Sequence, residues 1–228
     1  MSGFREVGEG VAMEAGTERS VTVPAGPVQL QGDLAMPAEA RGVVLFAHGS
    51  GSGRQSPRNR YVAEVLQQAQ FCTLLLDLLT ADEEAQDLYT REYRFDLPLL
   101  AERLVAATDW LTANPETQAL PLGYFGASTG AAAALIAATE RPEVVRAVVS
   151  RGGRPDLALE VLDRVQAPTL LLVGGYDSVV IDLNREAYAR LPGTKHLEII
   201  PAATHLLEEP GKLEEVARQA AAWFTRYL

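Results

Sequence analysis

The chain has 228 residues and a formal net charge of −10 at pH 7, with a sequence pI of about 4.8. Hydrophobic residues make up 47% of it and charged residues 22%, which is typical of a globular protein and excludes a disordered chain. An acidic chain lacks the basic face that neutralises phosphates, so we expect neither a nucleic-acid partner nor attraction to an anionic membrane.

The sequence gives no sign of export or of membrane insertion. Met1–Ser20 lacks the basic start followed by an apolar stretch that marks a signal peptide, and no apolar run is long enough to span a bilayer. The single cysteine, Cys72, excludes an internal disulfide and lies in an apolar run typical of a buried strand. We therefore expect a cytoplasmic protein that is a monomer or a homodimer.

The predicted elements alternate between strands and helices from about Arg41 onward, which is typical of an α/β fold with a mostly parallel sheet. Ahead of that region, Pro24-Ala25-Gly26-Pro27 separates strands 20–23 and 28–36, which predicts an antiparallel hairpin at a sheet edge. The further predicted strands are 42–47, 71–76, 121–125, 144–149, 169–173 and 196–200. The predicted helices are 59–70, 97–113, 131–138, 156–165, 180–191 and 213–227.

The predicted domain organisation is simple. Residues 20–228 form one domain with helices on both faces of the sheet, and residues 1–19 are an N-terminal extension whose order the sequence leaves open. Little sequence separates the strand that ends near Ser150 from the next predicted helix, so we expect no large cap domain.

The most informative motif is Gly126-Ala127-Ser128-Thr129-Gly130, which stands between an apolar strand and an alanine-rich helix. A serine on such a sharp turn projects its hydroxyl above the sheet, and small neighbours are needed because backbone segments approach closely there. The N-terminus of the following helix directs N–H groups at the place where an oxyanion forms during acyl transfer. We interpret Ser128 as a nucleophile.

A serine nucleophile needs an adjacent base, and the chain offers three histidines. His48 ends a strand and begins a glycine-rich loop, so we expect it to shape that loop. His196 alternates with apolar residues in a strand and should face outward. His205 follows the last strand in a loop from which it could reach back over the sheet, which makes it the candidate general base.

Asp177 is the candidate acid that orients His205, because it comes just past the carboxyl end of a buried strand, where sites of open α/β sheets lie. Asp182 is the alternative. Asp77 also ends a strand but precedes Ser128, which violates the Ser…Asp…His chain order, so we assign it to turn structure.

The loop His48-Gly49-Ser50-Gly51-Ser52-Gly53 supplies unobstructed N–H groups that could face the Thr129 N–H across the site. It lacks the Lys-Ser/Thr ending of a phosphate-binding P-loop and the G-x-G-x-x-G spacing of a dinucleotide-binding fold, so neither nucleotide interpretation is favoured.

Together, the His48-Gly49 loop, the serine motif, Asp177 and His205 resemble the α/β-hydrolase superfamily, and the small size resembles its dienelactone hydrolase-like branch. The resemblance implies an oxyanion hole formed by the backbone N–H groups of Ser50 and Thr129. Dienelactone hydrolases proper carry a cysteine nucleophile, whereas this chain has a serine. We therefore expect cleavage of a small-molecule carboxylic ester through an acyl-enzyme, without a metal or organic cofactor, and leave lactones and thioesters open.

The residues that bind the substrate are less clearly indicated. Segment 78–95 is a long connection that we interpret as either a lid or a solvated loop. Arginines gather at the expected site edge, where ion pairs with neighbouring acids are favoured and binding of a substrate carboxylate is the alternative. The candidates for substrate contacts are Gly49, Gly51, Arg54, Arg58, Arg151 and Tyr93.

Two other functions fit the same residues. The triad can transfer the acyl group to an alcohol, an amine or a peroxide instead of water, as an acyltransferase or perhydrolase does. A non-catalytic binding protein on this fold is the alternative from another class, but such proteins usually lose part of the triad, and all three members are present here.

Overall fold

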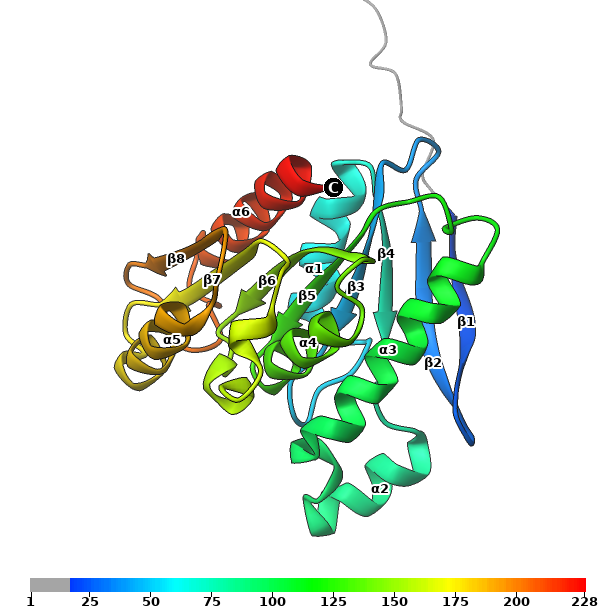
Figure 1. Cartoon of the computed structure of the whole chain (residues 1–228), viewed down its shortest axis with the longest axis horizontal. Coiled ribbons are helices and arrows are strands. Elements are labelled where there is room, and N and C mark those ends of the chain that lie inside the picture. Colours follow the sequence, from blue (N-terminus) through cyan, green and yellow to red (C-terminus); the bar gives the residue numbers. More distant parts are fainter. Residues whose placement is uncertain (1–16) are drawn as a thin grey trace, which may run out of the picture.

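A computed structural model describes residues 17–228, and in it eight strands form one sheet (Figure 1). Their order across the sheet is β1-β2-β4-β3-β5-β6-β7-β8. Strand β2 runs antiparallel to both of its neighbours, and all other neighbouring pairs are parallel. The strands are β1 (Thr17–Ala25), β2 (Val28–Met36), β3 (Gly42–Ala47), β4 (Phe71–Leu76), β5 (Leu122–Ala127), β6 (Val145–Arg151), β7 (Thr169–Gly174) and β8 (Lys195–Ile200). The predicted mostly parallel sheet with an N-terminal antiparallel hairpin is confirmed.

Helices cover both faces of this sheet, as predicted (Figure 1). Helices α1 and α6 pack on one face and share a hydrophobic core, while α3, α4 and α5 contribute to the core on the other face. The α-helices are α1 (Pro57–Gln68), α2 (Ala81–Thr90), α3 (Leu97–Ala113), α4 (Thr129–Glu140), α5 (Ser178–Arg190) and α6 (Lys212–Tyr227). The strands β3, β4, β5 and β7 have six residues each. Because both faces of the sheet are covered, every residue of these four strands is buried.

Local sequence signals fix where the helices near the site begin. Ser56 caps α1 by accepting a hydrogen bond from the Asn59 N–H, and Asp96 caps α3 by accepting one from the Leu99 N–H. A proline occupies the first turn of each of these helices, where no intrahelical N–H is needed. Helix α4 is rich in alanine, so its backbone lies close against the sheet.

The structure differs from the sequence prediction in two connections. Segment 78–95, predicted as a lid or a solvated loop, contains α2 and a 3-10 turn, η1 (Tyr93–Phe95). Helix α2 lies past the end of β4 and precedes α3 (Figure 1). The predicted helix 156–165 is wrong: two separate 3-10 turns, η2 (Pro155–Ala158) and η3 (Leu162–Arg164), take its place.

The start of the sheet also lies earlier than predicted. Strand β1 begins at residue 17, so residues 17–19 of the expected extension belong to the hairpin. The rest of that extension, residues 1–16, lies outside the described residues.

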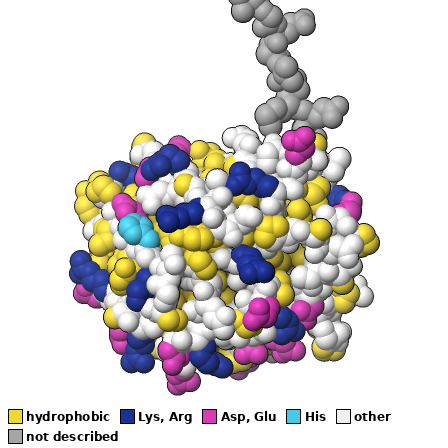
Figure 2. All heavy atoms as spheres, turned by 45° about the horizontal axis from the view of Figure 1, so that its top comes forward, with side chains coloured by type: hydrophobic (Ala, Val, Ile, Leu, Met, Phe, Trp, Pro, Cys, Tyr) yellow, Lys and Arg dark blue, Asp and Glu magenta, His cyan; other side chains and the backbone are white. Residues whose placement is uncertain are grey.

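The surface view shows basic and acidic side chains interspersed with hydrophobic ones (Figure 2). Between residues 17 and 228, no helix combines the length and the apolar character that crossing a membrane requires.

Candidate active site

The candidate site lies at the carboxyl ends of the parallel strands, where the loops after β3, β5, β6, β7 and β8 meet. Ser128 occupies the turn between β5 and α4 with φ 50° and ψ −122°. A positive φ is strained for a residue with a Cβ, and this strain is the mark of a nucleophile elbow. The Ser128 N–H donates to the Arg151 carbonyl oxygen (3.3 Å), and its own carbonyl accepts from the Arg154 N–H (3.1 Å).

The two glycines of the motif are required by close packing. A Cβ on Gly130 would overlap the carbonyl oxygens of Ala47 and His48, and a Cβ on Gly126 would overlap the backbone of Ala131. The elbow can therefore approach β3 and α4 only with glycine at both positions.

Asp177 and His205 are brought together as predicted. The Nδ1 atom of His205 lies 2.6 Å from Oδ2 of Asp177. A carboxylate at this position accepts the Nδ1 proton, which leaves Nε2 of the imidazole without a proton and able to act as a base. His205 is half-exposed, whereas the Asp177 side chain is largely buried.

The loop that carries His205 is held over the ends of β6 and β7 by close backbone contacts. The Tyr176 N–H donates to the Ala203 carbonyl oxygen (2.8 Å). A Cβ on Gly174 would overlap the Thr204 carbonyl, so only glycine lets the loop lie this close to β7. A Cβ on Gly152 would lie 3.7 Å from Cε1 of His205. The imidazole thus lies beside Gly152. The preceding residue, Arg151, accepts the hydrogen bond of the Ser128 N–H through its carbonyl oxygen.

The glycine loop after β3 lies against the elbow from the other side. A Cβ on Gly49 would be 3.0 Å from the Cβ of Ser128. The Ser50 N–H, one of the two expected oxyanion donors, points at Thr129 but donates to its side-chain oxygen Oγ1 (3.0 Å). Ser50 and Thr129 are therefore adjacent, and the Thr129 hydroxyl accepts the hydrogen bond of the Ser50 N–H. The oxyanion hole formed by the two N–H groups stays a prediction.

His48 shapes this loop, as predicted. Its Nε2 accepts a hydrogen bond from the Leu78 N–H (2.9 Å), so the ring proton is on Nδ1, which donates to the Gly49 carbonyl oxygen (2.9 Å). Burial lowers the pKa of His48 below its usual range, so the ring is neutral. His196 faces outward and contacts Glu198 (3.2 Å).

A cavity of about 290 Å³ adjoins the elbow between the glycine loop and α2. It contains two of the predicted substrate contacts, Gly49 and Gly51, but not Tyr93, whose hydroxyl instead contacts Gln86 (3.4 Å). The residues that line it are His48, Gly49, Ser50, Gly51, Ser52, Asp77, Leu79, Glu84, Asp87, Leu88, Arg94, Leu100 and Thr129.

Segment 78–95, a lid or a solvated loop by prediction, supplies part of this wall through α2 and η1, and its helical structure was not predicted. A signal for α2 is present in Thr80-Ala81-Asp82-Glu83, a capping box in which the Thr80 side chain and the Glu83 side chain each bind the other residue's backbone N–H. Arg94 lines the cavity while paired with Asp87, whose pKa is lowered by hydrogen bonds from the Arg94 N–H and side chain despite its burial.

Most of the clustered arginines form ion pairs with the protein's own acids. Arg58 pairs with Glu208, and Arg154 makes two hydrogen bonds with Asp156 (both 2.8 Å). Arg54 bridges Asp77 and Asp33. These contacts agree with the favoured interpretation, in which the arginines form ion pairs with neighbouring acids. They also give Asp77 an ion pair with Arg54, apart from Asp177 and His205. The alternative acid Asp182 is exposed and pairs with Arg185 (3.0 Å).

Arg151 differs from the other arginines. It is only 7% exposed, and within residues 17–228 it takes part in no salt bridge. Its Nη1 donates to the Leu206 carbonyl oxygen (3.2 Å), next to His205 in the chain. Burial, together with the nearby charge of Arg58, lowers the pKa of Arg151 to about 10.

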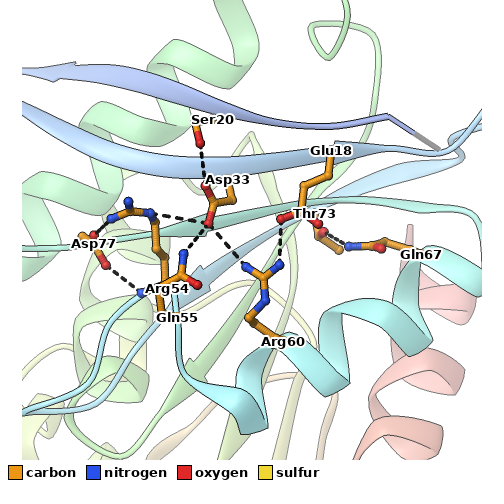
Figure 3. A network of polar contacts seen from close by, with 9 residues as sticks. All are labelled: Glu18, Ser20, Asp33, Arg54, Gln55, Arg60, Gln67, Thr73 and Asp77. Carbon is orange, nitrogen blue, oxygen red and sulfur yellow. Dashed lines mark hydrogen bonds and ion pairs between the residues drawn. The ribbon is translucent and has the colours of Figure 1, made fainter. Parts of the chain in front are cut away.

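The glycine loop is also anchored to the N-terminal hairpin through Asp33 on β2 (Figure 3). This nearly buried carboxylate accepts from Ser20 Oγ (3.1 Å) and Gln55 Nε2 (3.0 Å), and it contacts the guanidinium groups of Arg54 and Arg60 (both 3.4 Å). Since the Arg54 N–H also donates to Asp77 (2.6 Å), the far end of the loop is fixed to β2 and to the end of β4. In the described part of the chain, no group of three or more His, Cys, Asp or Glu residues is arranged to hold a metal ion.

Comparisons with known proteins show the family of the chain. A model of the dienelactone hydrolase family matches residues 30–223. A crystal structure of a dienelactone hydrolase from Anabaena variabilis is 63% identical, with a TM-score of 0.93, and the match covers 94% of this chain and 100% of that one. An esterase from Pyrococcus furiosus has a similar fold at 17% identity (TM-score 0.76; 93% and 92% covered).

Two curated proteins of Mycobacterium tuberculosis, provisionally named phosphoribosyl transferases, are 55% identical to this chain. The match covers 98% of this chain but 51% of each of theirs, so the chain spans about half the length of these relatives. The family match covers most of the chain, and the Anabaena structure matches nearly all of it. The chain therefore belongs to the dienelactone hydrolase family, a family of hydrolases with the α/β-hydrolase fold.

Proposed function

We propose that the chain hydrolyses carboxylic esters through an acyl-enzyme on Ser128. The observation that carries this proposal is the 2.6 Å contact between His205 Nδ1 and Asp177 Oδ2 at the sheet edge where Ser128 occupies a strained elbow. A paired imidazole and carboxylate beside a serine is an arrangement that activates an alcohol as a nucleophile.

In the first half of the proposed reaction, Nε2 of His205 takes the Ser128 proton as the serine oxygen attacks the ester carbonyl. The negative charge that develops on the carbonyl oxygen faces the N-terminus of α4, where the Thr129 N–H has no partner within the helix. The protonated imidazole then gives its proton to the leaving alcohol, and the acyl group remains on Ser128. Asp177 stabilises the imidazolium throughout.

In the second half, water replaces the alcohol. His205 takes a proton from the water, the resulting hydroxide attacks the acyl-enzyme, and the proton returns to Ser128 as the acid leaves. The same intermediate would react with an alcohol, an amine or a peroxide, so product analysis with competing nucleophiles distinguishes hydrolysis from acyl transfer.

Phosphoribosyl transfer, the activity in the name of the mycobacterial relatives, is not part of this proposal. This chain spans about half of those proteins, and the remaining half lies outside the match. Phosphoribosyl transfer would then reside in the half of those relatives that this chain does not match.

The test is covalent labelling of the full chain with a fluorophosphonate probe, combined with turnover of a p-nitrophenyl ester. We expect the wild-type chain to be labelled and active, and the Ser128→Ala variant to be neither. A matched control is Ser52→Ala, which removes a serine hydroxyl from the cavity wall but not from the elbow. Labelling or turnover that persists in Ser128→Ala would refute the assignment of the nucleophile.

A further inference from the structure

In the predicted oxyanion hole, the backbone N–H groups of Ser50 and Thr129 are both donors to the substrate. In the structure, the Ser50 N–H already has a partner. The Ser50 N–H is hydrogen-bonded to Thr129 Oγ1 at 3.0 Å, and Thr129 is 4% exposed. The hydroxyl of Thr129 thus contacts one of the two N–H groups expected to bind an oxyanion, the other N–H belongs to Thr129 itself, and Thr129 also lines the cavity beside the elbow.

Two other buried threonines, Thr108 and Thr117, use their hydroxyl protons within the protein. Thr108 donates to the Leu104 carbonyl oxygen (2.8 Å), and Thr117 donates to that of Leu111 (2.6 Å). Thr108 can do so because it lies inside a helix, with a carbonyl four residues earlier. Thr129 is the first residue of α4 and has no helical carbonyl behind it, and the hydrogen bond of its hydroxyl is one that it accepts. Its proton is therefore available for another acceptor.

We propose that the Thr129 hydroxyl is a further catalytic group, which donates its proton in a hydrogen bond to the oxyanion while it accepts one from the Ser50 N–H. This inference rests on the proposed function, because it requires an oxyanion formed by attack of Ser128. In that step the bond from Ser128 Oγ to the carbonyl carbon forms and the carbonyl π bond breaks, with its electron pair moving to the oxygen. The serine proton goes to His205, and Thr129 keeps its own.

Two physical reasons favour this role over simple anchoring of the loop. A hydroxyl that already accepts a hydrogen bond is a stronger donor, because hydrogen bonds in a chain polarise one another. The hydroxyl is also nearly excluded from solvent and fixed from two sides, by the α4 backbone and by the Ser50 N–H, so it requires little reorganisation as charge develops.

The test compares Thr129→Val, which removes the hydroxyl at nearly constant shape, with Thr129→Ser, which keeps it. Thr139→Val, on the same helix, is the matched control for loss of a threonine hydroxyl. We expect Thr129→Val to lower kcat/KM for a p-nitrophenyl ester by about 100-fold or more, the usual effect of losing one oxyanion donor. Thr129→Ser and Thr139→Val should stay within about fivefold of wild type.

A second readout separates catalysis from structure. A trifluoromethyl ketone forms a tetrahedral adduct with a serine and places an oxyanion in the site, so its inhibition constant should rise in Thr129→Val by about the same factor as kcat/KM falls. The melting temperature and circular dichroism of the variant show whether it folds, and Thr129→Ala removes the same hydroxyl if the valine variant does not.

The outcomes are distinct for the two proposals. If wild type is labelled and active but Thr129→Val keeps or exceeds its activity, the hydroxyl only occupies the Ser50 N–H, and this inference alone is overturned. If Thr129→Val loses activity without weaker binding of the ketone, the hydroxyl does not contact the oxyanion. If wild type shows neither labelling nor turnover, the proposed function is overturned and this inference with it.

Discussion

At the scale of single residues, the site depends on how His205 is oriented. Its Nδ1 atom is held by Asp177, and an asparagine there would present an amide that can hold the wrong tautomer of the ring. We predict that Asp177→Asn lowers kcat by about 10³-fold to 10⁴-fold with little change in melting temperature. Steady-state kinetics against Asp182→Asn, an exposed carboxylate on α5, provide the comparison. Similar activity in both variants would remove Asp177 from the triad.

Arg151 is the residue on which a charged substrate would depend. Among the clustered arginines, it is the one that is buried and has no acid partner in the part of the chain described. If it binds a substrate carboxylate, Arg151→Ala should reduce kcat/KM for carboxylate-bearing esters about tenfold more than for neutral esters, because a charge-assisted hydrogen bond is lost. Arg146→Ala, an exposed change on the same strand, is the control. Equal losses on both ester types would limit Arg151 to holding the His205 loop through Leu206.

His48 makes stability depend on pH. Burial lowers its pKa below the usual histidine value of about 6.5, so below that pH the unfolded chain binds a proton that the folded chain does not. Stability is therefore retained above pH 6.5 and falls as the pH drops below it, by up to about 1.4 kcal/mol per pH unit from this residue. Urea unfolding between pH 5 and 8 should show a shallower pH slope for His48→Gln than for wild type. An unchanged slope would mean that other groups cause the dependence.

At the scale of elements, the N-terminal hairpin supports the glycine loop from outside the site. Asp33 on β2 accepts hydrogen bonds or ion pairs from Arg54, Gln55 and Arg60, which follow that loop or begin α1 (Figure 3). Removing the carboxylate takes away one of the two acid partners of Arg54 and one of the two of Arg60, so Asp33→Ala should cost about 2 kcal/mol of unfolding free energy and also lower kcat.

Urea unfolding and ester turnover measure both effects. Glu18→Gln removes the exposed partner of Arg60 from the same network, and it should cost under about 1 kcal/mol and leave turnover unchanged. A loss of stability in Asp33→Ala without a loss of kcat would show that the hairpin supports the fold but not the loop.

Elements with strong local signals were predictable from the sequence. The helix Leu97–Ala113 and the strands Gly42–Ala47 and Phe71–Leu76 have the predicted bounds, and the other buried strands differ from prediction by one or two residues at an end. Helix α2 was missed because its sequence is mostly polar, although Thr80 and Glu83 mark its start. The motif placed Ser128 at the elbow because the strand, the turn and the helix follow one another in the sequence, and Gly126 packs against nearby Ala131. The hydrogen bond from Ser50 to Thr129 could not be predicted, because it depends on how the loop after β3 packs against α4.

The ion-pair partners of the arginines also could not be predicted from the sequence where they depend on contacts between distant segments. The sequence predicts ion pairs of these arginines with neighbouring acids without naming the partners, and Arg154 pairs with the nearby Asp156. Arg58 instead pairs with Glu208, and Arg54 with Asp33 and Asp77, all distant in the sequence. Such partners follow from strand order and loop packing, which composition and periodicity do not specify.

At the scale of the whole molecule, one sheet forms the wall between two hydrophobic cores. Trp110 on α3 packs against the core on one face, and Trp223 on α6 packs against the core on the other. Both cores pack against the same strands, so loss of packing in one core would expose one face of these strands to solvent and weaken the other core. We therefore predict a single cooperative unfolding transition.

The two tryptophans make this prediction measurable, since the sequence contains no others. Trp110→Phe leaves a fluorescent reporter on the α6 face, and Trp223→Phe leaves one on the α3 face. In each variant, the urea midpoint from fluorescence should coincide with the midpoint from far-ultraviolet circular dichroism, because one event removes local packing and secondary structure together. A fluorescence midpoint separated from the circular dichroism midpoint in either variant would divide the chain into independently unfolding parts, contrary to the single domain predicted for residues 20–228.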